Sequence, residues 1–509
     1  MFELWSIPQS WSWGNLDDVA FWGSGGTPKT SESKYYGGDI PWLVISDLND
    51  GIVAESAKTI TELGLLESNA KLVPKGAILI AMYGSIGKLG IAGIECATNQ
   101  AIAFTTAIEK GIDNKYLFYF LLNIRKDLLN LGKGGTQANI SQTVLKKVPV
   151  PIAPLEEQRR IVLKLEQLLT KINNCKERLD RIPALLKRFR QSVLAAACSG
   201  RLTADWRERN LDMERASELL KRIRYERLRK RWYGQKSINV YSAIENFEKV
   251  VLYEIPSSWE WTFLIEFHGE EQLVLTGPFG TTLRKDDFQK AGVPVITIGC
   301  LKDAGLLLEK ALFVSQQKAD ELSRYKVKKD DLLFSRMGTV GKAAKVTEEL
   351  EGALINYHIM RLRLPNWIAI DYFLYVIKGA KSTPLFLKEI NHGVTRDGIK
   401  TQELLGIPIP LPPLEEQHEI VRRVEALFEM ADRIEARYQK ARAYVEKLMQ
   451  SVLAKAFRGE LVPQNPDDEP ASVLLARIRE ERARREAELR AAGRGRRLPA
   501  RRRKKAGKP

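Results

Sequence analysis

The sequence contains few residues of the kinds that form metal sites or disulfide bonds. Among 509 residues there are four histidines and four cysteines, and Cys96, Cys175, Cys198 and Cys300 form no CxxC pair. Neither a structural zinc site nor a disulfide framework is therefore expected. The N-terminus lacks the basic start of a signal peptide, and no apolar run approaches the ~18 residues that span a bilayer. We expect a protein of the reducing cytoplasm with no membrane partner.

Catalytic and nucleotide-binding motifs are also missing. The loops GSIGK at 84–88 and GTVGK at 338–342 have two residues between their glycines, whereas a Walker A loop needs four, and a Ser or Thr after its lysine. GSGGT at 23–27 has the wrong spacing for a dinucleotide-binding fingerprint. Since HExxH and GxSxG are also absent, we assign no catalytic residue, metal or cofactor to this chain.

Basic residues outnumber acidic residues. The 80 Lys and Arg against 63 Asp and Glu give a formal charge of +17, which favours a polyanionic partner such as nucleic acid. Residues 493–509 alone contain nine Lys or Arg and no acid, which leaves +8 for the rest. We expect this tail to be disordered. It is either a nonspecific DNA tether or a solubilising extension.

The sequence repeats itself over nearly its whole length. PLEEQ occurs at 154–158 and again at 413–417, and 140–200 aligns with 399–459 without a gap. The chain therefore contains two copies of one unit, each a variable globular part followed by a helical part.

Apolar residues in both helical parts are spaced alternately by four and three. This a/d pattern is typical of a coiled coil, which needs a partner helix to cover its apolar seam; the alternative is a pair of unrelated surface helices. The predicted seam comprises Ile161, Leu165, Leu168, Ile172, Leu179 and Leu186 in the first copy and Ile420, Val424, Leu427, Ile434, Val445 and Leu448 in the second.

PLEEQ is typical of a helix start. Proline fits the first turn, where its missing N–H would be unpaired, and the two glutamates favour the positive end of the helix dipole. Pro183 should interrupt the first helix near Leu179. The second copy has Arg442 at the matching position.

The globular parts consist of short apolar runs separated by glycine, proline and asparagine, which predicts an α+β fold. Their loops mix glycine with hydroxyl, amide and basic side chains, the groups that contact phosphates and base edges in duplex DNA. For any single residue the alternative is a solvated turn. The DNA-binding candidates are Thr27, Lys29, Thr30, Lys34, Ser85, Lys88, Gln137 and Asn139 in the first part and Thr281, Thr282, Arg284, Lys285, Arg336, Thr339, Lys342, Thr395 and Arg396 in the second.

The two α+β parts, each closed by a PLEEQ helix start and an SVLAxAxxG ending, resemble the specificity (S) subunit of type I restriction-modification systems. GGTPKT at 25–30 and YYGGDIPW at 35–42 resemble that family's first recognition domain, whereas the second part departs from it with GPFGTT at 277–282. The features of that family can therefore be transferred less directly to the second globular part than to the first.

The resemblance implies a pseudo-two-fold architecture. Two target recognition domains would each read one half of a bipartite, asymmetric site in double-stranded DNA, and two spacer helices, packed as an antiparallel coiled coil, would set the gap between the halves. The expected segments are recognition domains at 1–153 and 251–412, spacer helices at 154–200 and 413–460, a helical linker at 201–250, and a helical, basic, partly disordered tail at 461–509.

The resemblance also implies partners. Two modification (M) subunits would methylate adenine with S-adenosylmethionine, and restriction (R) subunits would use ATP and Mg²⁺ to cut DNA, while this chain would hold no catalytic residue. One alternative is a DNA methyltransferase or nuclease whose active site carries no recognisable motif. Another is a coiled-coil scaffold protein that does not touch DNA.

Overall fold

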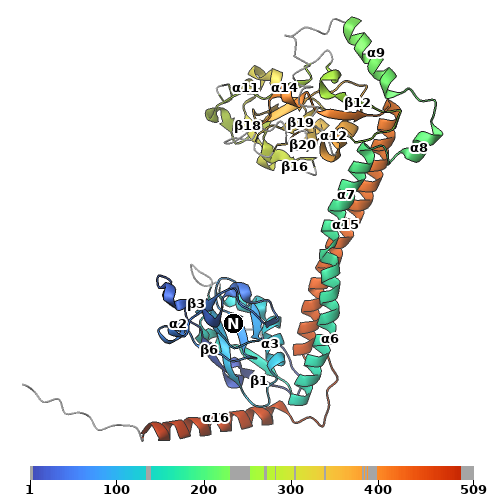
Figure 1. Ribbon diagram of the computed structural model, residues 1–509. Coiled ribbons are helices and arrows are strands. Elements are labelled where there is room, and N and C mark those ends of the chain that lie inside the picture. The colour runs from blue at the N-terminus through green and yellow to red at the C-terminus, as the bar shows by residue number, and fades with distance from the viewer. Residues whose placement is uncertain are drawn as a thin grey trace, which may run out of the picture. The chain divides into compact units, whose positions relative to one another are not determined.

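The chain forms two compact units. The computed structural model describes residues 4–132, 139–229, 253–268, 272–280, 282–302, 305–337, 340–380, 383, 387 and 398–494. The first unit contains Met1–Asp180 and Gln439–Pro509, and the second contains Arg181–Tyr438. Each unit therefore combines an α+β domain with helical segments from both sequence copies (Figure 1). The basic residues 495–509, predicted to be disordered, lie outside the described part of the chain.

The described residues of the first domain form three sheets. The five-stranded sheet has the order β2 (Ala20–Ser24), β10 (Ile102–Ile108), β7 (Ile78–Ala81), β8 (Leu89–Ala92) and β4 (Ile52–Val53). The four-stranded sheet has the order β5 (Thr59–Ile60), β3 (Tyr36–Leu43), β9 (Cys96–Thr98) and β6 (Leu72–Val73). The third sheet pairs β1 (Ser12–Asn15) with β11 (Pro149–Ile152). Together with α3 (Asn114–Asn123) and α4 (Arg125–Leu131), these sheets confirm the predicted α+β fold.

The second domain repeats this plan. One four-stranded sheet has the order β13 (Val274–Thr276), β22 (Ile359–Leu362), β19 (Leu332–Ser335) and β20 (Ala343–Lys345). The other has the order β14 (Phe288–Gln289), β18 (Leu312–Val314), β15 (Val293–Ile296) and β21 (Leu354–Ile355). β12 (Glu260–Phe263) pairs with β23 (Pro408–Leu411) as β1 does with β11, and α12 (Ile370–Gly379) corresponds to α3.

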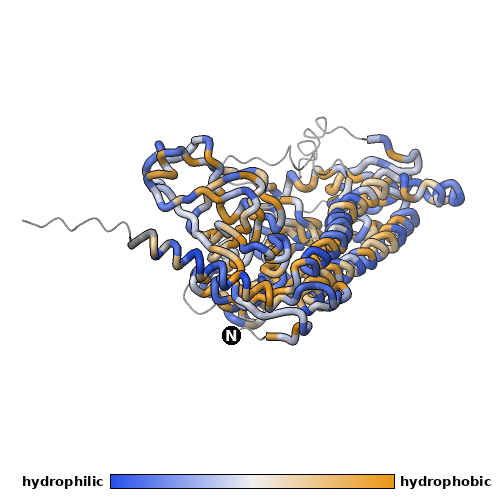
Figure 2. The backbone as a smooth tube through the Cα atoms, turned by 90° about the horizontal axis from the view of Figure 1, so that it is seen from below, coloured by the Kyte–Doolittle hydropathy of each residue, from blue (hydrophilic) through white to orange (hydrophobic). Residues whose placement is uncertain are grey.

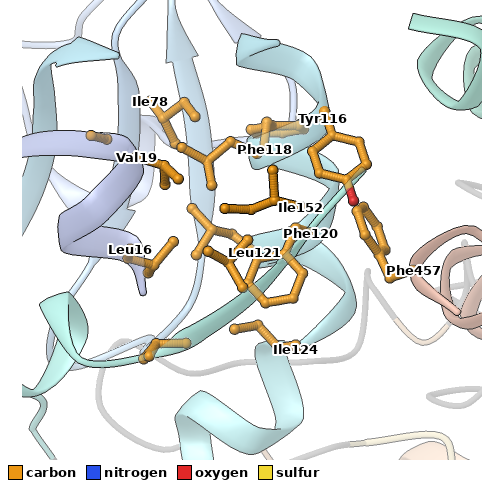
Figure 3. Close-up of a cluster of buried hydrophobic side chains, with 14 of the residues drawn as sticks. Leu16, Val19, Ile78, Tyr116, Phe118, Phe120, Leu121, Ile124, Ile152 and Phe457 are labelled. Carbon is orange, nitrogen blue, oxygen red and sulfur yellow. The ribbon is translucent and has the colours of Figure 1, made fainter. Parts of the chain in front are cut away.

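Aromatic side chains join the first domain to the end of a long helix. Phe457, the last residue of α15 (Leu414–Phe457), points toward Tyr116 and Phe120 of α3, with ring centroids 5.1 and 5.4 Å apart (Figure 3). Tyr116 also donates its hydroxyl to the carbonyl of Pro151 at 2.8 Å. Burial raises the pKa of the Tyr116 phenol well above its usual range. The domain core and the helix therefore share one apolar cluster.

The long helices run antiparallel in each unit. α6 (Leu155–Asp180) starts against the first domain, and the C-terminal end of α15 packs on the same domain. In the second unit the end of α7 (Ile182–Cys198) and the start of α15 both pack against the second domain. In Figure 1, α6 lies beside the C-terminal part of α15 and α7 beside its N-terminal part. The predicted antiparallel coiled coil is confirmed.

The predicted seam is buried unevenly. Ile161, Leu165, Ile172, Leu186, Ile420 and Val424 are buried, whereas Leu168, Leu179, Leu427 and Val445 are half-buried. Ile434 and Leu448 keep 40% and 38% of their surface exposed, and these two positions correct the predicted seam. A helix of 3.6 residues per turn drifts by about 20° per heptad from a strict seven-residue repeat. Part of such a stripe therefore turns toward solvent unless the helices supercoil.

The first spacer consists of two helices rather than one. α6 ends at Asp180 and α7 begins at Ile182, with Pro183 in its first turn. The interruption predicted from Pro183 is therefore confirmed. α15, with Arg442 at the matching position, continues unbroken over 44 residues. Proline is tolerated in a first turn because the N–H that it lacks has no partner there.

The second glutamate of each PLEEQ motif is buried. Glu157 accepts the indole N–H of Trp11 at 2.9 Å and the amide of Gln464 at 2.6 Å. Glu416 accepts the indole N–H of Trp259 at 2.8 Å. The helix-dipole role predicted for both glutamates is thus incomplete, since the second one joins the helix to a tryptophan of the adjoining domain.

The two buried carboxylates differ in their remaining partners. Glu416 also accepts the Thr203 hydroxyl at 2.7 Å and the Arg207 guanidinium at 2.7 Å. Among the described residues the hydrogen-bond donors to Glu157 are neutral, and burial raises the pKa of its carboxyl group. In both units the additional donors come from the segment that follows a long helix of the other sequence copy.

The glutamine of PLEEQ is buried in both copies. The Gln158 amide accepts the backbone N–H of Asp113 at 2.8 Å and donates to the carbonyl of Ala153 at 2.8 Å. Gln417 accepts from Ala369 at 2.8 Å and donates to Pro412 at 3.0 Å. Each glutamine therefore joins the helix start to the loop that precedes α3 or α12.

A further helix that follows each spacer packs on the domain of the other copy. α9 (Ala216–Arg229) begins with a hydrogen bond of 3.0 Å from the Ala216 N–H to the Ser258 carbonyl, and α16 (Ala471–Arg494) with one of 2.9 Å from Ala471 to Ser10. Apart from its few core contacts, α16 is mainly hydrophilic (Figure 2). Each copy of the repeat therefore supplies a helix to the domain of the other copy. No described helix has the length and apolar content needed to cross a bilayer.

Proline substitutions should affect the two spacers differently. Arg442→Pro places proline inside α15 and should cost ~3 kcal/mol or more of stability, because it removes a hydrogen bond and clashes with the preceding turn. Pro183→Arg should change stability by less than ~1 kcal/mol, because Pro183 lies in a first turn. Urea unfolding followed by circular dichroism measures both effects. Similar losses in the two variants would contradict this account.

The two buried glutamates should respond differently to Glu→Gln. Glu416→Gln should destabilise the second unit by ~2–3 kcal/mol, because it leaves the Arg207 guanidinium without its carboxylate. Glu157→Gln should cost less, ~1–2 kcal/mol, because it leaves no cation without its carboxylate, although its single amide oxygen can accept only one of the two neutral donors. Hydrogen exchange in α8 (Ala204–Arg209) and at the starts of α6 and α15 reports the two sites separately. Equal deprotection at the two sites would rule out the difference.

Candidate nucleic-acid interface

Four loop segments of the first domain meet at one end of β7. The N–H of Gly25 donates to the Ile102 carbonyl at 3.2 Å, and that of Met82 donates to the Ala101 carbonyl at 2.7 Å. The N–H of Ile140 donates to the carbonyl of Met82 at 2.8 Å. These backbone bonds connect the segments 24–27, 82–88, 99–102 and 139–140, which we call the first loop array.

The second domain contains the same array. The N–H of Gly277 donates to the Ile359 carbonyl at 3.1 Å, that of Arg336 to His358 at 3.0 Å, and that of Ile399 to Arg336 at 2.9 Å. Each bond matches one of the three bonds in the first loop array. The segments 276–280, 336–337, 340–342, 356–359 and 398–400 form the second loop array.

A glycine is required at the same point of both arrays. A Cβ atom on Gly25 would lie 2.2 Å from the Thr98 carbonyl oxygen, and one on Gly277 would lie 2.1 Å from that of Asn356. Both contacts are with backbone, which cannot move aside as a flexible side chain can. This constraint explains why glycine remains at this position while the residues after it differ between the copies.

Aromatic residues fix the glycine loop of the first domain. Trp42 donates its indole N–H to the Gly26 carbonyl at 3.1 Å, and Tyr36 donates its hydroxyl to the Pro28 carbonyl at 2.7 Å. The Tyr36 and Trp42 rings also pack edge to face with centroids 5.9 Å apart. The YYGGDIPW motif therefore shapes the loop that carries Thr27.

The candidates on this glycine loop have different environments. Lys29, Thr30 and Lys34 are exposed, while Thr27 is half-buried and donates its hydroxyl to the side-chain carbonyl of Gln100. A cavity of about 490 Å³ opens beside Thr27, lined by the loop with Asn69, Lys71 and Gln100.

The candidates of the 83–88 turn adjoin the same array. Ser85 is exposed, and Asn139 forms a β-bridge with Tyr83. Lys88 donates its ammonium group to the carbonyls of Ile45 and Ser46 at 3.0 and 3.3 Å, so that it holds two loops together. The candidate Gln137 lies outside the described residues.

In the second domain, Thr282, Arg284 and Lys285 are exposed and Lys342 is half-buried. Arg336 donates from Nε to the Ile399 carbonyl at 3.2 Å and from Nη1 to that of Tyr357 at 3.5 Å. Burial lowers the pKa of its guanidinium. Arg336 therefore connects segments of the loop array. The candidates Thr281, Thr339, Thr395 and Arg396 lie outside the described residues.

Sequence reasoning missed the turn at the centre of each array. NQAI at 99–102 and NYHI at 356–359 occupy matching places in the two arrays, and neither is among the predicted candidates. Comparing the copies strand by strand would have revealed the shared Asn-x-x-Ile pattern. Asn69 and Lys71 also line the cavity and belong to no predicted motif. Among the described residues, no cluster of three or more His, Cys, Asp or Glu could hold a metal ion.

Comparison with known proteins identifies relatives over both copies. The family model for the type I restriction modification DNA specificity domain matches residues 8–184 and 278–441. The EcoBI specificity subunit of Escherichia coli is 29% identical over 489 residues, covering 94% of each chain. The MjaIX specificity subunit of Methanocaldococcus jannaschii is 24% identical, covering 90% of this chain and 95% of its own.

A solved structure shares the fold. A chain from a structure described as the basis of complex assembly and conformational transition of a type I restriction-modification system superimposes with a TM-score of 0.61 at 18% identity. The match covers 90% of this chain and all of that chain. The tandem arrangement of α+β domains and long helices is thus a known fold.

Two glycines three residues apart should differ in their tolerance of a methyl group. Gly277→Ala should cost the second unit ~1–3 kcal/mol, because its Cβ would overlap the Asn356 backbone. Gly280→Ala should be neutral or slightly stabilising, because no atom of the described residues beyond its chain neighbours lies within 4 Å of the added Cβ. Thermal unfolding compares the two variants. Equal stability would show that the loop adapts without cost.

Proposed function

This chain belongs to the type I restriction-modification DNA specificity family, and from that premise we propose that it selects the DNA sequence for a complex whose other subunits perform the chemistry. Each α+β domain reads one half of a bipartite target. The chain contributes no catalytic residue. The same proposal includes a cytoplasmic location, in keeping with four cysteines that are all free thiols.

The repeated loop array supports this proposal most strongly. Three backbone hydrogen bonds of one domain recur in the other between matching residues, so the two domains hold their loops in the same way. The side chains on these loops differ, for example Met82 against Arg336 and Gln100 against Tyr357. One scaffold with two sets of side chains suits a DNA site whose two halves differ in sequence.

The partners follow from the same assignment. Two modification subunits would supply adenine methylation with S-adenosylmethionine, and restriction subunits would supply ATP- and Mg²⁺-dependent cleavage. The paired long helices would set the gap between the half-sites. The formal charge of +17 fits a DNA partner, because basic side chains that neutralise phosphates release counterions on binding.

Reconstitution with modification subunits tests this function. With S-adenosylmethionine, the complex should methylate adenine only within a two-part motif, and its DNA binding should weaken steeply as salt rises. The chain alone should show no methylation, which serves as the control. Methylome sequencing of a host that carries these genes should show the motif, and deletion of this chain should remove it. Methylation by the chain alone, or a motif that survives the deletion, would refute the proposal.

A further inference from the structure

The two loop arrays hold the same turn with different side chains at its centre. In NQAI at 99–102, the Asn99 side-chain oxygen accepts the backbone N–H two residues later at 3.2 Å. In NYHI at 356–359, Asn356 makes the same bond at 3.2 Å. In both turns the isoleucine N–H returns to the asparagine carbonyl, at 3.2 and 3.0 Å. The first and last residues therefore fix the turn, and the two between them vary without changing it.

Gln100 occupies an exposed place in the first of these turns. Its side chain forms part of the wall of the cavity of about 490 Å³, together with the glycine loop, Asn69 and Lys71. The Thr27 hydroxyl donates to Oε1 of Gln100 and so fixes the direction of the amide. Thr27 lies on the glycine loop, in which the Gly26 carbonyl accepts the indole N–H of Trp42. Thr27 therefore gives the exposed Gln100 amide a preferred direction.

Two of the basic candidates, one in each domain, bind carbonyls of their own loops. The ammonium group of Lys88 binds the carbonyls of Ile45 and Ser46, and the guanidinium of Arg336 binds those of Ile399 and Tyr357. Each group uses two of its N–H donors to bind loop carbonyls, which fixes its position relative to the loops. Both therefore help to position the loops, and the turn that each adjoins carries a side chain of its own, Gln100 in the first domain and Tyr357 in the second.

We propose that Gln100 recognises an adenine in the half-site read by the first domain, and that Tyr357 occupies the matching reading position in the second. This inference rests on the proposed function. In the major groove adenine offers the N6 amino group as donor and N7 as acceptor. Oε1 of Gln100 has a second lone pair for N6–H, and its Nε2 donates to N7. Lys71, exposed at the cavity rim, contacts a neighbouring phosphate.

The test measures methylation by the complex of the full chain with its modification subunits on a duplex library randomised over both half-sites. Gln100→Ala should reduce the preference for one A·T pair in one half-site by about 5- to 150-fold, with the other half-site unchanged. Gln100→Glu keeps the side-chain size but only accepts, so the preference at that position should move toward C·G, whose cytosine offers N4–H.

Tyr357→Ala is the matched variant, and it should change the preference within the other half-site only. An unchanged preference at every position in Gln100→Ala would overturn the role of Gln100, as would an equal loosening of both half-sites. Retained adenine selection in Gln100→Glu would overturn the proposed hydrogen bonds. If the wild-type complex itself shows no two-part motif, the proposed function fails before any variant is compared, so the two failures are distinguishable.

Discussion

A buried carboxylate at the start of each long arm connects the parts of this protein. Glu157 and Glu416 each accept an indole N–H from the domain beside them and further donors from a segment that follows the other copy's long helix. A carboxylate removed from water needs these donors, because an unpaired buried charge is far more costly than a paired one. One side chain thereby orders three segments that are distant in sequence. The same pairing of the two sequence copies is seen in the long helices, which run antiparallel, and in α9 and α16, each of which packs on the domain of the other copy.

The loop arrays show how one scaffold supports two recognition surfaces. Backbone hydrogen bonds hold Gly25 and Gly277 in matching places, and they depend little on side-chain identity apart from the requirement for glycine. The intervening side chains can therefore change while the turns persist. The same constraint separates two roles among polar residues. Lys88 and Arg336 bind carbonyls of neighbouring loops, whereas Gln100 projects from its turn into a polar cavity.

Patterns with a regular period predicted the fold well. The four-three spacing predicted the paired long helices, Pro183 predicted the interruption between α6 and α7, and the internal repeat predicted two α+β domains. The exposure of Ile434 and Leu448 was missed, because heptad spacing does not report how far a helix drifts from its partner. The burial of the second PLEEQ glutamate was missed for a related reason. Its tryptophan partners, Trp11 and Trp259, are more than 140 residues away in sequence.

The loop chemistry was harder to predict than the helices because loops have no period. Composition pointed to the first glycine loop and to the 83–88 turn, which backbone hydrogen bonds join in the first loop array. Composition does not reveal whether a lysine or arginine faces solvent or binds a carbonyl of its own protein, since both uses need the same donor groups. Lys88 and Arg336 were chosen for their charge, yet Gln100, which is uncharged, lies where its amide can meet a ligand. For a protein that must distinguish one base from another, it is physically reasonable that an uncharged amide meets the ligand while these charged groups support the loops. Charge gives affinity for any DNA, whereas a fixed pair of donor and acceptor distinguishes one base edge.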